Sequence, residues 1–251
     1  METRYDRNRL YITPEEQEKI KDIPIILGGS GIGSVIAECA LRLGFENITI
    51  VDGDTIELTN LNRQNYTEDD LSESKAETIK NRLQSINKTA KITVLDYYLT
   101  TENLRGIIEG HKIAINALDF SSDVPLLFDS ICQELQIPVL HPYNLGWGGL
   151  ITIIDPGGCS LSSIAKPNKR FNEIDVVEYA SSYLKYWGNK QEWLEEIIWK
   201  YKNEKEKLSP PQLSIASWML GGICTHVLFN VATNKDVKVF PEFYLSTLMH
   251  S

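Results

Sequence analysis

A glycine-rich turn joins a short apolar strand to a helix near the start of the chain. The strand is expected over 23–27 and the helix over 34–43, with Gly-Gly-Ser-Gly-Ile-Gly between them. A helix that begins after such a turn points unpaired N–H groups toward it, and these groups bind anions. The third position of the run is serine, where a dinucleotide-binding loop has glycine. The turn alone is therefore a weak signal for phosphate, and a turn that binds nothing is the alternative. Its candidate contacts are Gly28, Ser30, Gly31 and Gly33.

Acidic side chains follow the next expected strand, over 47–51. Asp52 stands 19 residues beyond Gly33, close to the ~20 residues at which a carboxylate reaches the ribose hydroxyls of a nucleotide. Asp54 follows two residues later. The spacing indicates an adenosine nucleotide, and it leaves open whether that nucleotide is a hydride carrier such as NAD or a reactive triphosphate.

Cations and amides come directly after these carboxylates. Asn60, Arg63 and Gln64 lie in one short stretch, and Lys75 lies eleven residues beyond it. When a carboxylate attacks the α-phosphate of ATP, negative charge builds on the phosphoryl oxygens and on the departing pyrophosphate, and fixed cations stabilise that charge. A redox enzyme has little use for two cations at the phosphate end. We therefore favour a triphosphate, with Arg63 and Lys75 as catalytic residues.

One more carboxylate is expected at the same edge of the sheet. Asp119 lies just beyond the strand expected over 113–117, and open α/β sheets bind ligands at the carboxyl ends of their strands. A carboxylate at that place could hold Mg²⁺. Asp119 is therefore the candidate magnesium ligand of the site.

These residues need a sheet to bring them together, and the chain supplies the pattern for one. Strands and helices alternate up to about residue 145, which predicts a doubly wound, mostly parallel, Rossmann-like α/β sheet. We expect a strand over 150–154 to extend the sheet in antiparallel fashion. Residues 160–210 are expected to form a helical insertion within one domain, 1–251, and a long apolar core helix follows. The other expected strands are 91–95 and 137–140, and the helices are 74–86, 124–135, 172–207 and 213–231.

The chain resembles the ThiF/MoeB/HesA family, bacterial relatives of ubiquitin-activating enzymes. Residues 4–7, Arg-Tyr-Asp-Arg, are similar to the RY-[ND]-R opening of the family, and VDGDTIELTNLNRQ matches its VDxDxVxxSNLxRQ pattern almost position for position. The resemblance covers nearly everything except about 160–210. It assigns Asp52 to the ribose, Asn60 and Arg63 to the phosphates, Lys75 to the α/β-phosphate region, and Asp119 to magnesium or the reacting centre. Arg7 would reach ATP from a partner subunit, which implies a homodimer.

The cysteines depart from the pattern of some family members. Members with structural zinc carry two CxxC pairs, and the four cysteines of this chain form no such pair, so we expect no zinc site. Members that form a thioester or persulfide use a cysteine in the crossover region. Cys159 is the candidate there, although no neighbouring base or cation is evident to lower its pKa. An incidental residue is the favoured interpretation of Cys159.

Composition narrows the partners and the compartment. The 25 basic and 34 acidic residues give a formal charge of −9, which disfavours a protein built to coat nucleic acid or an anionic membrane. No run approaching the ~18 apolar residues of a membrane span is expected outside the core. Separated cysteines fit reduced thiols, and we expect a soluble, cytoplasmic protein.

The sequence thus predicts an ATP-dependent adenylyltransferase that converts a carboxylate to an acyl-adenylate with release of pyrophosphate. The resemblance implies a substrate that is the C-terminal glycine of a ubiquitin-like or sulfur-carrier protein, or a short peptide. Three alternatives remain open: a tRNA-modifying member of the same superfamily, an NAD-dependent oxidoreductase, and a non-catalytic nucleotide-binding scaffold.

Overall fold

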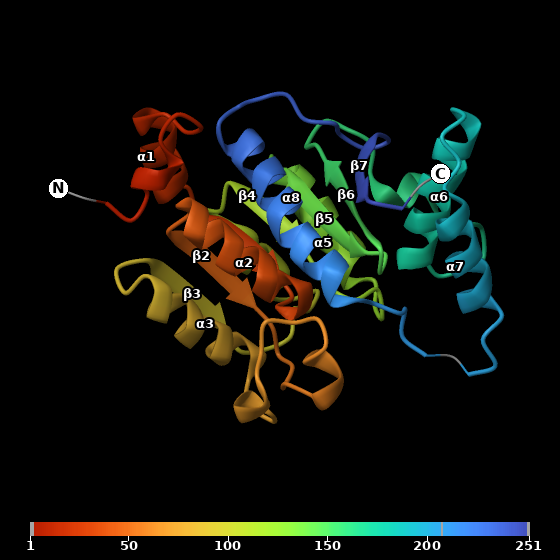
Figure 1. Ribbon diagram of the computed structural model, residues 1–251, viewed down its shortest axis with the longest axis horizontal. Helices are drawn as coiled ribbons and strands as arrows, with labels where there is room; N and C mark the ends of the chain where they lie inside the picture. The colour runs from red at the N-terminus through yellow and green to blue at the C-terminus, as the bar shows by residue number, and fades with distance from the viewer. Residues whose placement is uncertain (1–2, 207, 250–251) are drawn as a thin grey trace.

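Seven strands form one sheet in the computed structural model, which describes residues 3–206 and 208–249 (Figure 1). The strand order is β3-β2-β1-β4-β5-β6-β7. The first five strands run parallel, β6 pairs antiparallel with β5, and β7 pairs antiparallel with β6. The predicted parallel sheet with an antiparallel extension is therefore confirmed. The strands are β1 (Ile25–Gly28), β2 (Asn47–Val51), β3 (Lys91–Leu95), β4 (Ile113–Asn116), β5 (Val139–Asn144), β6 (Gly148–Ile154) and β7 (Phe243–Thr247).

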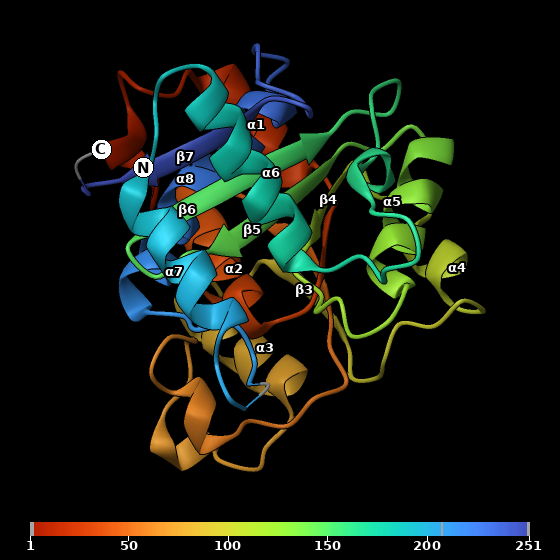
Figure 2. The ribbon, with the colours of Figure 1, turned by 90° about the vertical axis from the view of Figure 1, so that its right-hand side faces the viewer.

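Helices cover both faces of this sheet, as the two views in Figures 1 and 2 show. One face packs against α1 (Pro14–Asp22), α2 (Gly31–Leu43), α3 (Lys75–Ile86) and α8 (Ser214–Ala232). The other face packs against α4 (Leu104–Ile108), α5 (Val124–Glu134), α6 (Glu173–Tyr186) and α7 (Glu192–Lys202). Each strand therefore feeds two cores, which explains why its sequence is apolar without alternation. In β1, for example, Ile25 and Leu27 enter one core and Ile26 the other.

The structure corrects several predicted boundaries. The helix expected from residue 34 begins at Gly31, inside the glycine run. The strand expected over 137–140 begins at Val139, because the N–H of Ile137 donates to the Cys132 carbonyl and closes the end of α5. The helical region expected over 172–207 is two helices, separated where Gly188 adopts a φ of +78°.

Three elements were missing from the prediction, namely α1, α4 and β7. The start of α1 does carry a sequence signal. Thr13 and Glu16 form a reciprocal capping box, and Pro14 occupies the first helical position. The short helix α4 and the edge strand β7 have no comparable signal, because both depend on packing against distant segments.

Helix α8 is apolar on all sides and needs separate consideration. By length and composition its 19 residues could cross a membrane, so the expectation that no run approaches such a span is wrong for this segment. Within the fold, however, 56% of that apolar window is buried. Leu220, Cys224 and Leu228 enter the core shared with α2 and the sheet. The predicted role of α8 as a core helix is therefore confirmed.

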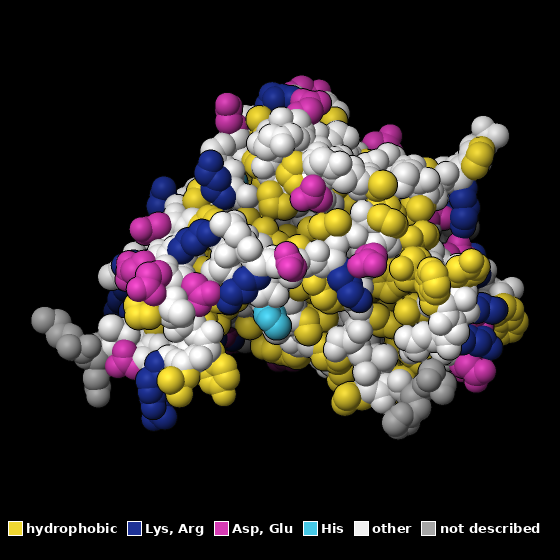
Figure 3. Space-filling view, turned by 90° about the horizontal axis from the view of Figure 1, so that it is seen from above, with side chains coloured by type: hydrophobic (Ala, Val, Ile, Leu, Met, Phe, Trp, Pro, Cys, Tyr) yellow, Lys and Arg dark blue, Asp and Glu magenta, His cyan; other side chains and the backbone are white. Residues whose placement is uncertain are grey.

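Charged side chains on the surface are mixed in sign. On the face in Figure 3, Lys and Arg side chains lie among Asp and Glu side chains. Several of the basic residues of α6 and α7 are engaged in ion pairs, such as Lys185 with Glu195 and Lys202 with Glu178. The lysines of these helices therefore do not add up to a strongly positive surface.

One buried carboxylate ties α2 to its neighbours and gives a pH-dependent prediction. Burial alone would raise the pKa of Glu38, but hydrogen bonds from Arg82, Asn65 and Arg42 outweigh burial and hold the pKa below its usual value of 4.5. The stabilisation is therefore present above about pH 4.5 and is lost as the pH falls through the lowered pKa. Glu38→Gln should lower the free energy of unfolding at pH 7 by about 2 kcal/mol.

Urea denaturation at several pH values measures this effect. The difference between Glu38→Gln and the wild type should shrink in acid, while the exposed control Glu18→Gln should differ little from the wild type at any pH. A difference that stays constant from pH 7 to pH 3 would contradict the assignment of the charge.

Candidate active site

The glycine turn lies where the order of the sheet reverses. Strands β1 and β4 are neighbours, and the chain proceeds to β2 on one side and to β5 on the other. Ligands of open α/β sheets bind at this switch point, beyond the carboxyl ends of the strands. Gly29 adopts a φ of +89°, and α2 starts two residues later. The N-terminal N–H groups of α2 therefore face the edge at which Asp52 and Asp119 also emerge.

Ser30 has a defined role in this turn. It is completely buried. Both its backbone N–H (2.6 Å) and its hydroxyl (2.8 Å) donate to Oδ2 of Asp52, and the N–H of Asp54 donates to Oδ1 (2.9 Å). Three donors thus fix the carboxylate that was predicted to bind the ribose. The hydroxyl of Tyr66, which sequence reasoning missed, donates to the Ser30 carbonyl (2.9 Å) and supports the turn from below.

Lys75 is held beside the carboxylates by Asp54. Its Nζ lies 2.9 Å from Oδ2 of Asp54, and the buried Lys75 is the first residue of α3. Burial raises the pKa of Asp54, but hydrogen bonds from Lys75 and from the Tyr98 hydroxyl (2.9 Å) lower it further, below its usual value. Asp54 is therefore ionised, and it orients the Lys75 ammonium. Tyr98 is a second residue that sequence reasoning missed.

Arg63 is held differently, by neutral oxygens. One Nη donates to the Thr59 carbonyl (2.7 Å) and to Oδ1 of Asn62 (2.9 Å), and Nε donates to Oε1 of Gln212. Among the residues that the structure describes, none forms an ion pair with Arg63. Burial lowers the pKa of Arg63 and the carboxylate of Asp119 opposes that shift; a guanidinium stays protonated regardless. Arg63 is thus an oriented cation that keeps its charge.

The two amides of this stretch have structural as well as candidate ligand roles. Oδ1 of the buried Asn60 accepts the N–H of Glu57 (3.0 Å) and shapes the 3₁₀ turn η2 (Leu58–Asn60) that carries Arg63. The Gln64 side chain lies against the glycine turn, since a Cβ added to Gly31 would stand 3.2 Å from its Nε2. Oε1 of Gln64 is buried and has no partner among the described residues, so it can accept a donor from a ligand.

Asp119 lies in the loop between β4 and α5, at the edge of the same group. Solvent reaches it on one side, yet surrounding protein and the nearby carboxylate of Glu173 raise the pKa of Asp119 above its usual value, while Lys75 opposes the shift. Glu173 begins α6 and accepts the N–H of Phe120 (3.1 Å). The insertion therefore contributes a carboxylate to the site, which sequence reasoning missed.

Two predicted residues lie away from this group. Arg7 belongs to η1 (Asp6–Asn8), whose neighbour Tyr5 donates to Glu46 (2.7 Å), just before β2. That end of the parallel strands is opposite the Asp52 edge, so Arg7 cannot act on the site of its own chain. Cys159 follows β6, whose antiparallel direction brings the chain back to the edge opposite Asp52.

His141, which was predicted to be structural, is so. It is buried, and its Nε2 lies 2.8 Å from Oδ1 of the buried Asp129. The ring packs near Phe120, with centroids 6.4 Å apart. Phe120 in turn contacts Phe171 at the start of the insertion. His141 therefore supports the loop of Asp119 from within the core.

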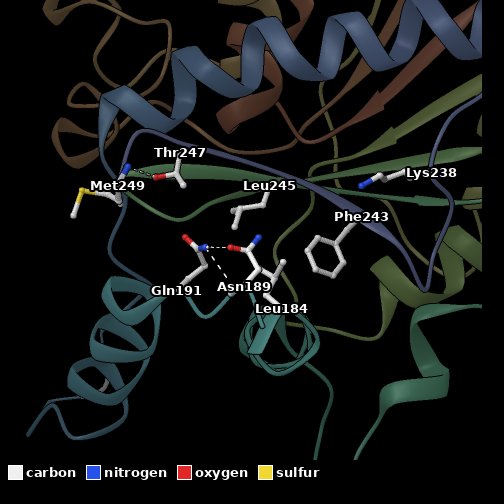
Figure 4. Close-up of a pocket in the computed structure, with 8 residues that line it drawn as sticks. All are labelled: Leu184, Asn189, Gln191, Lys238, Phe243, Leu245, Thr247 and Met249. Carbon is white, nitrogen blue, oxygen red and sulfur yellow. Dashed lines mark hydrogen bonds between the residues drawn. The ribbon is translucent and has the colours of Figure 1, made fainter. Parts of the chain in front are cut away.

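A cavity of about 390 Å³ lies elsewhere, between β7 and the connection of α6 to α7 (Figure 4). Phe243, Leu245 and Thr247 of β7 line one side, and the amides of Asn189 and Gln191, which bond one another (3.1 Å), line the other. Its lining residues include none of the carboxylates or cations described above. We therefore place the candidate nucleotide site at the glycine turn and not in this cavity.

The bond between Ser30 and Asp52 gives a prediction for nucleotide binding. Ser30→Ala removes one of the three donors that fix the Asp52 carboxylate. We expect the Kd for ATP to rise about threefold to tenfold, since one such hydrogen bond contributes about 1 kcal/mol. Isothermal titration calorimetry measures the change. Ser85→Ala, on the exposed side of α3, is the control, and an unchanged Kd in Ser30→Ala would contradict the role given to Ser30.

Known proteins share both the sequence pattern and the fold. The Sulfur carrier protein ThiS adenylyltransferase of Bacillus subtilis (strain 168) is 34% identical over 163 residues, which cover 62% of this chain and 48% of that protein. The tRNA threonylcarbamoyladenosine dehydratase of Escherichia coli (strain K12) is 31% identical over 143 residues, which cover 56% of this chain and 51% of that protein. The chain thus spans about half the length of these relatives.

Solved structures extend the fold similarity over the whole chain. The crystal structure of E. coli MccB with MccA-N7isoASN has a TM-score of 0.72 at 17% identity, covering 100% of this chain and 73% of that one. The crystal structure of E. coli MccB with ATP has a TM-score of 0.69 at 17% identity, covering 99% and 72%. At such identities the likeness shows the fold alone. The ThiF family profile matches residues 5–248, and the chain therefore belongs to the ThiF family.

Proposed function

We propose that the protein is an ATP-dependent adenylyltransferase. The observation that carries the proposal is the pair of differently held cations at the switch point: Lys75 is buried against Asp54, and Arg63 is oriented by neutral oxygens. An oxidoreductase needs no such pair. Family membership and the name of the relative from B. subtilis support the same activity.

The reaction assigns a task to each group. An oxygen of the substrate carboxylate attacks the α-phosphorus of ATP, the bond between the α-phosphorus and its bridging oxygen to the β-phosphate breaks, and pyrophosphate leaves with that oxygen. Asp52 holds the ribose hydroxyls, and the N-terminus of α2 faces the phosphates. Lys75 and Arg63 stabilise the charge that develops on the phosphoryl oxygens and on the pyrophosphate. The product is an acyl-adenylate.

A magnesium ion fits the acidic edge of this site. Asp119 is an accessible carboxylate with Asp52, Asp54 and Glu173 near enough to influence its ionisation, and Mg²⁺ prefers one or two carboxylates together with phosphate oxygens. Asp119 would be the ligand from the protein. The ion would neutralise phosphate charge, and Glu173 would hold the backbone of the Asp119 loop in place through the N–H of Phe120.

For the substrate we propose the C-terminal carboxylate of a small carrier protein or of a peptide. One relative is named for a sulfur carrier protein, and the similar fold of MccB was solved with the peptide MccA. We further propose that the chain is one adenylation domain that acts in the cytoplasm. A homodimer would bring Arg7 of one subunit to the nucleotide of the other, which is consistent with the position of Arg7 at the edge opposite its own site.

Pyrophosphate exchange into ATP tests the activity. We expect exchange in the presence of Mg²⁺ and a carrier protein or peptide that ends in glycine, and none with the C-terminal amide of the same peptide. Lys75→Ala should abolish exchange, whereas Lys80→Ala, one turn further along α3 and partly exposed, should retain it. Exchange that survived in Lys75→Ala would overturn the role of Lys75.

A second candidate is a tRNA-modifying activity, which the relative from E. coli favours. Such a protein activates a carboxylate on a nucleoside, and its RNA contacts need a positive surface. The net charge of −9 and the mixed charges seen in Figure 3 disfavour it. Exchange that requires transfer RNA, and no peptide, would establish this alternative. A melting temperature raised by NAD and unaffected by ATP would instead favour an oxidoreductase, and binding of ATP without exchange would favour a scaffold.

A further inference from the structure

A short segment links the helical insertion to the phosphate end of the candidate site. Residues 209–213, here called the strap, connect α7 to α8 and run along the ligand edge of the sheet, at the lower right in Figure 1. Nδ2 of Asn144, at the end of β5, donates to the Leu213 carbonyl (2.9 Å), and Nδ2 of Asn62 donates to the Gln212 carbonyl (3.3 Å). The backbone of the strap is thus fastened to the sheet on one side and to the Arg63 stretch on the other.

The side chain of Gln212 is the contact that matters for function. Its Oε1 accepts the Nε–H of Arg63, across 149 residues of sequence. The other acceptors around the guanidinium, the Thr59 carbonyl and Asn62, come from the same local stretch as Arg63. Gln212 is therefore the contact that fixes Arg63 relative to the strap and, through it, to the insertion and α8.

The chemistry of this acceptor is informative. A glutamate at position 212 would form an ion pair with Arg63 and neutralise the charge that a phosphate needs. An amide oxygen orients the guanidinium and leaves its positive charge in place. Lys75 differs, since Asp54 pairs with it directly. Of these two cations, Arg63 is the one whose charge is available without first displacing a carboxylate.

We propose that Gln212 is a positioning residue for Arg63, and that the strap uses it to set the affinity of the site for the triphosphate. This inference rests on the proposed function, because Arg63 must act on phosphate. It assigns to the end of the insertion a role that reaches the nucleotide. A carboxylate substrate that rests on the insertion would thereby influence the orientation of Arg63.

Titration calorimetry with MgATP tests the proposal on the full chain. Gln212→Glu should weaken ATP binding about 10- to 100-fold, because a charge-assisted pair with Arg63 must be broken. Gln212→Ala should weaken it by a smaller factor, about threefold to tenfold. The control Ser209→Glu adds the same charge to an exposed position of the strap and should change Kd by less than about twofold. Thermal melting establishes that each variant is folded.

A double-mutant cycle separates positioning from a general structural effect. In the background of Arg63→Ala, Gln212→Glu should have no further effect on the Kd, because the group that it neutralises is gone. A Kd for Gln212→Glu equal to that of the wild type would overturn the inference. So would an equal loss in Ser209→Glu, or an equal further loss in the Arg63→Ala background. A wild-type protein that does not bind ATP would overturn the proposed function and this inference together. Loss of binding in Gln212→Glu that depends on Arg63 would support the inference even if no carboxylate substrate gave exchange.

Discussion

Replacing Arg63 by alanine is expected to lower the rate of pyrophosphate exchange by about 10²- to 10³-fold, the range seen when one preorganised group that stabilises developing charge is removed. Arg63 is half-buried and held by three neutral oxygens, so its orientation is fixed before the nucleotide arrives. A preorganised cation loses little entropy when charge develops beside it. The loss should therefore appear mainly in kcat, with a smaller rise in the KM for ATP.

Two further variants define this result. Arg63→Lys keeps the charge but loses the planar fork that bonds Thr59, Asn62 and Gln212 together, so we expect an activity between those of the wild type and Arg63→Ala. Arg105→Ala is the control, since Arg105 lies on α4 and pairs on the surface with Glu134. Steady-state exchange rates as a function of ATP concentration give both parameters. Exchange in Arg63→Ala within about threefold of the wild type would remove Arg63 from the catalytic group.

The sheet was predictable because its signals are local. Each parallel strand is a short apolar run that feeds two cores, and each run is separated from the next by an amphipathic helix, as in β1, α2 and β2. The errors arise where tertiary contacts decide. The edge strand β7 forms because β6 offers it a partner, and the fifth strand is displaced because Ile137 closes α5. No period in the sequence carries that information.

The site divides along the same line. Asp52, Arg63 and Lys75 follow strand ends or helix starts within one stretch of chain, so spacing and a family pattern were enough to single them out. Their partners come from elsewhere: Tyr98 binds Asp54 across 44 residues, and Gln212 binds Arg63 across 149. A tyrosine or glutamine at such a distance has no spacing rule. Only the folded arrangement identifies these residues as parts of the site.

The glycine turn is the place where spacing and conformation give different information. By spacing, Ser30 weakens the match to a dinucleotide-binding loop, because a side chain stands where glycine is usual. In the fold, that side chain points away from the open edge and donates to Asp52. The departure from the pattern is therefore compatible with nucleotide binding. The residue in this turn that does require glycine is its neighbour, Gly29, which a pattern of first, third and sixth positions leaves unmarked.

Gly29→Ala is accordingly expected to be strongly destabilising, by about 2 to 4 kcal/mol. Gly29 adopts a φ of +89°, and a Cβ there would stand 2.5 Å from the Ala117 carbonyl oxygen and 2.9 Å from its carbon. Neither atom can move freely, because the N–H of Ala117 donates to the Gly28 carbonyl and joins the ends of β4 and β1. The strain would push apart the two strands that frame the nucleotide site, so ATP binding should fall together with stability. Urea denaturation followed by circular dichroism measures the change. Gly106→Ala is the matched control, since Gly106 lies in α4, has a helical neighbourhood and would place its Cβ in open space; that variant should be stabilised by about 0.5 to 1 kcal/mol. If Gly29→Ala unfolded at the same urea concentration as the wild type, the turn could accept a side chain, and the close approach of β1 to β4 would not be what defines the phosphate loop of this protein.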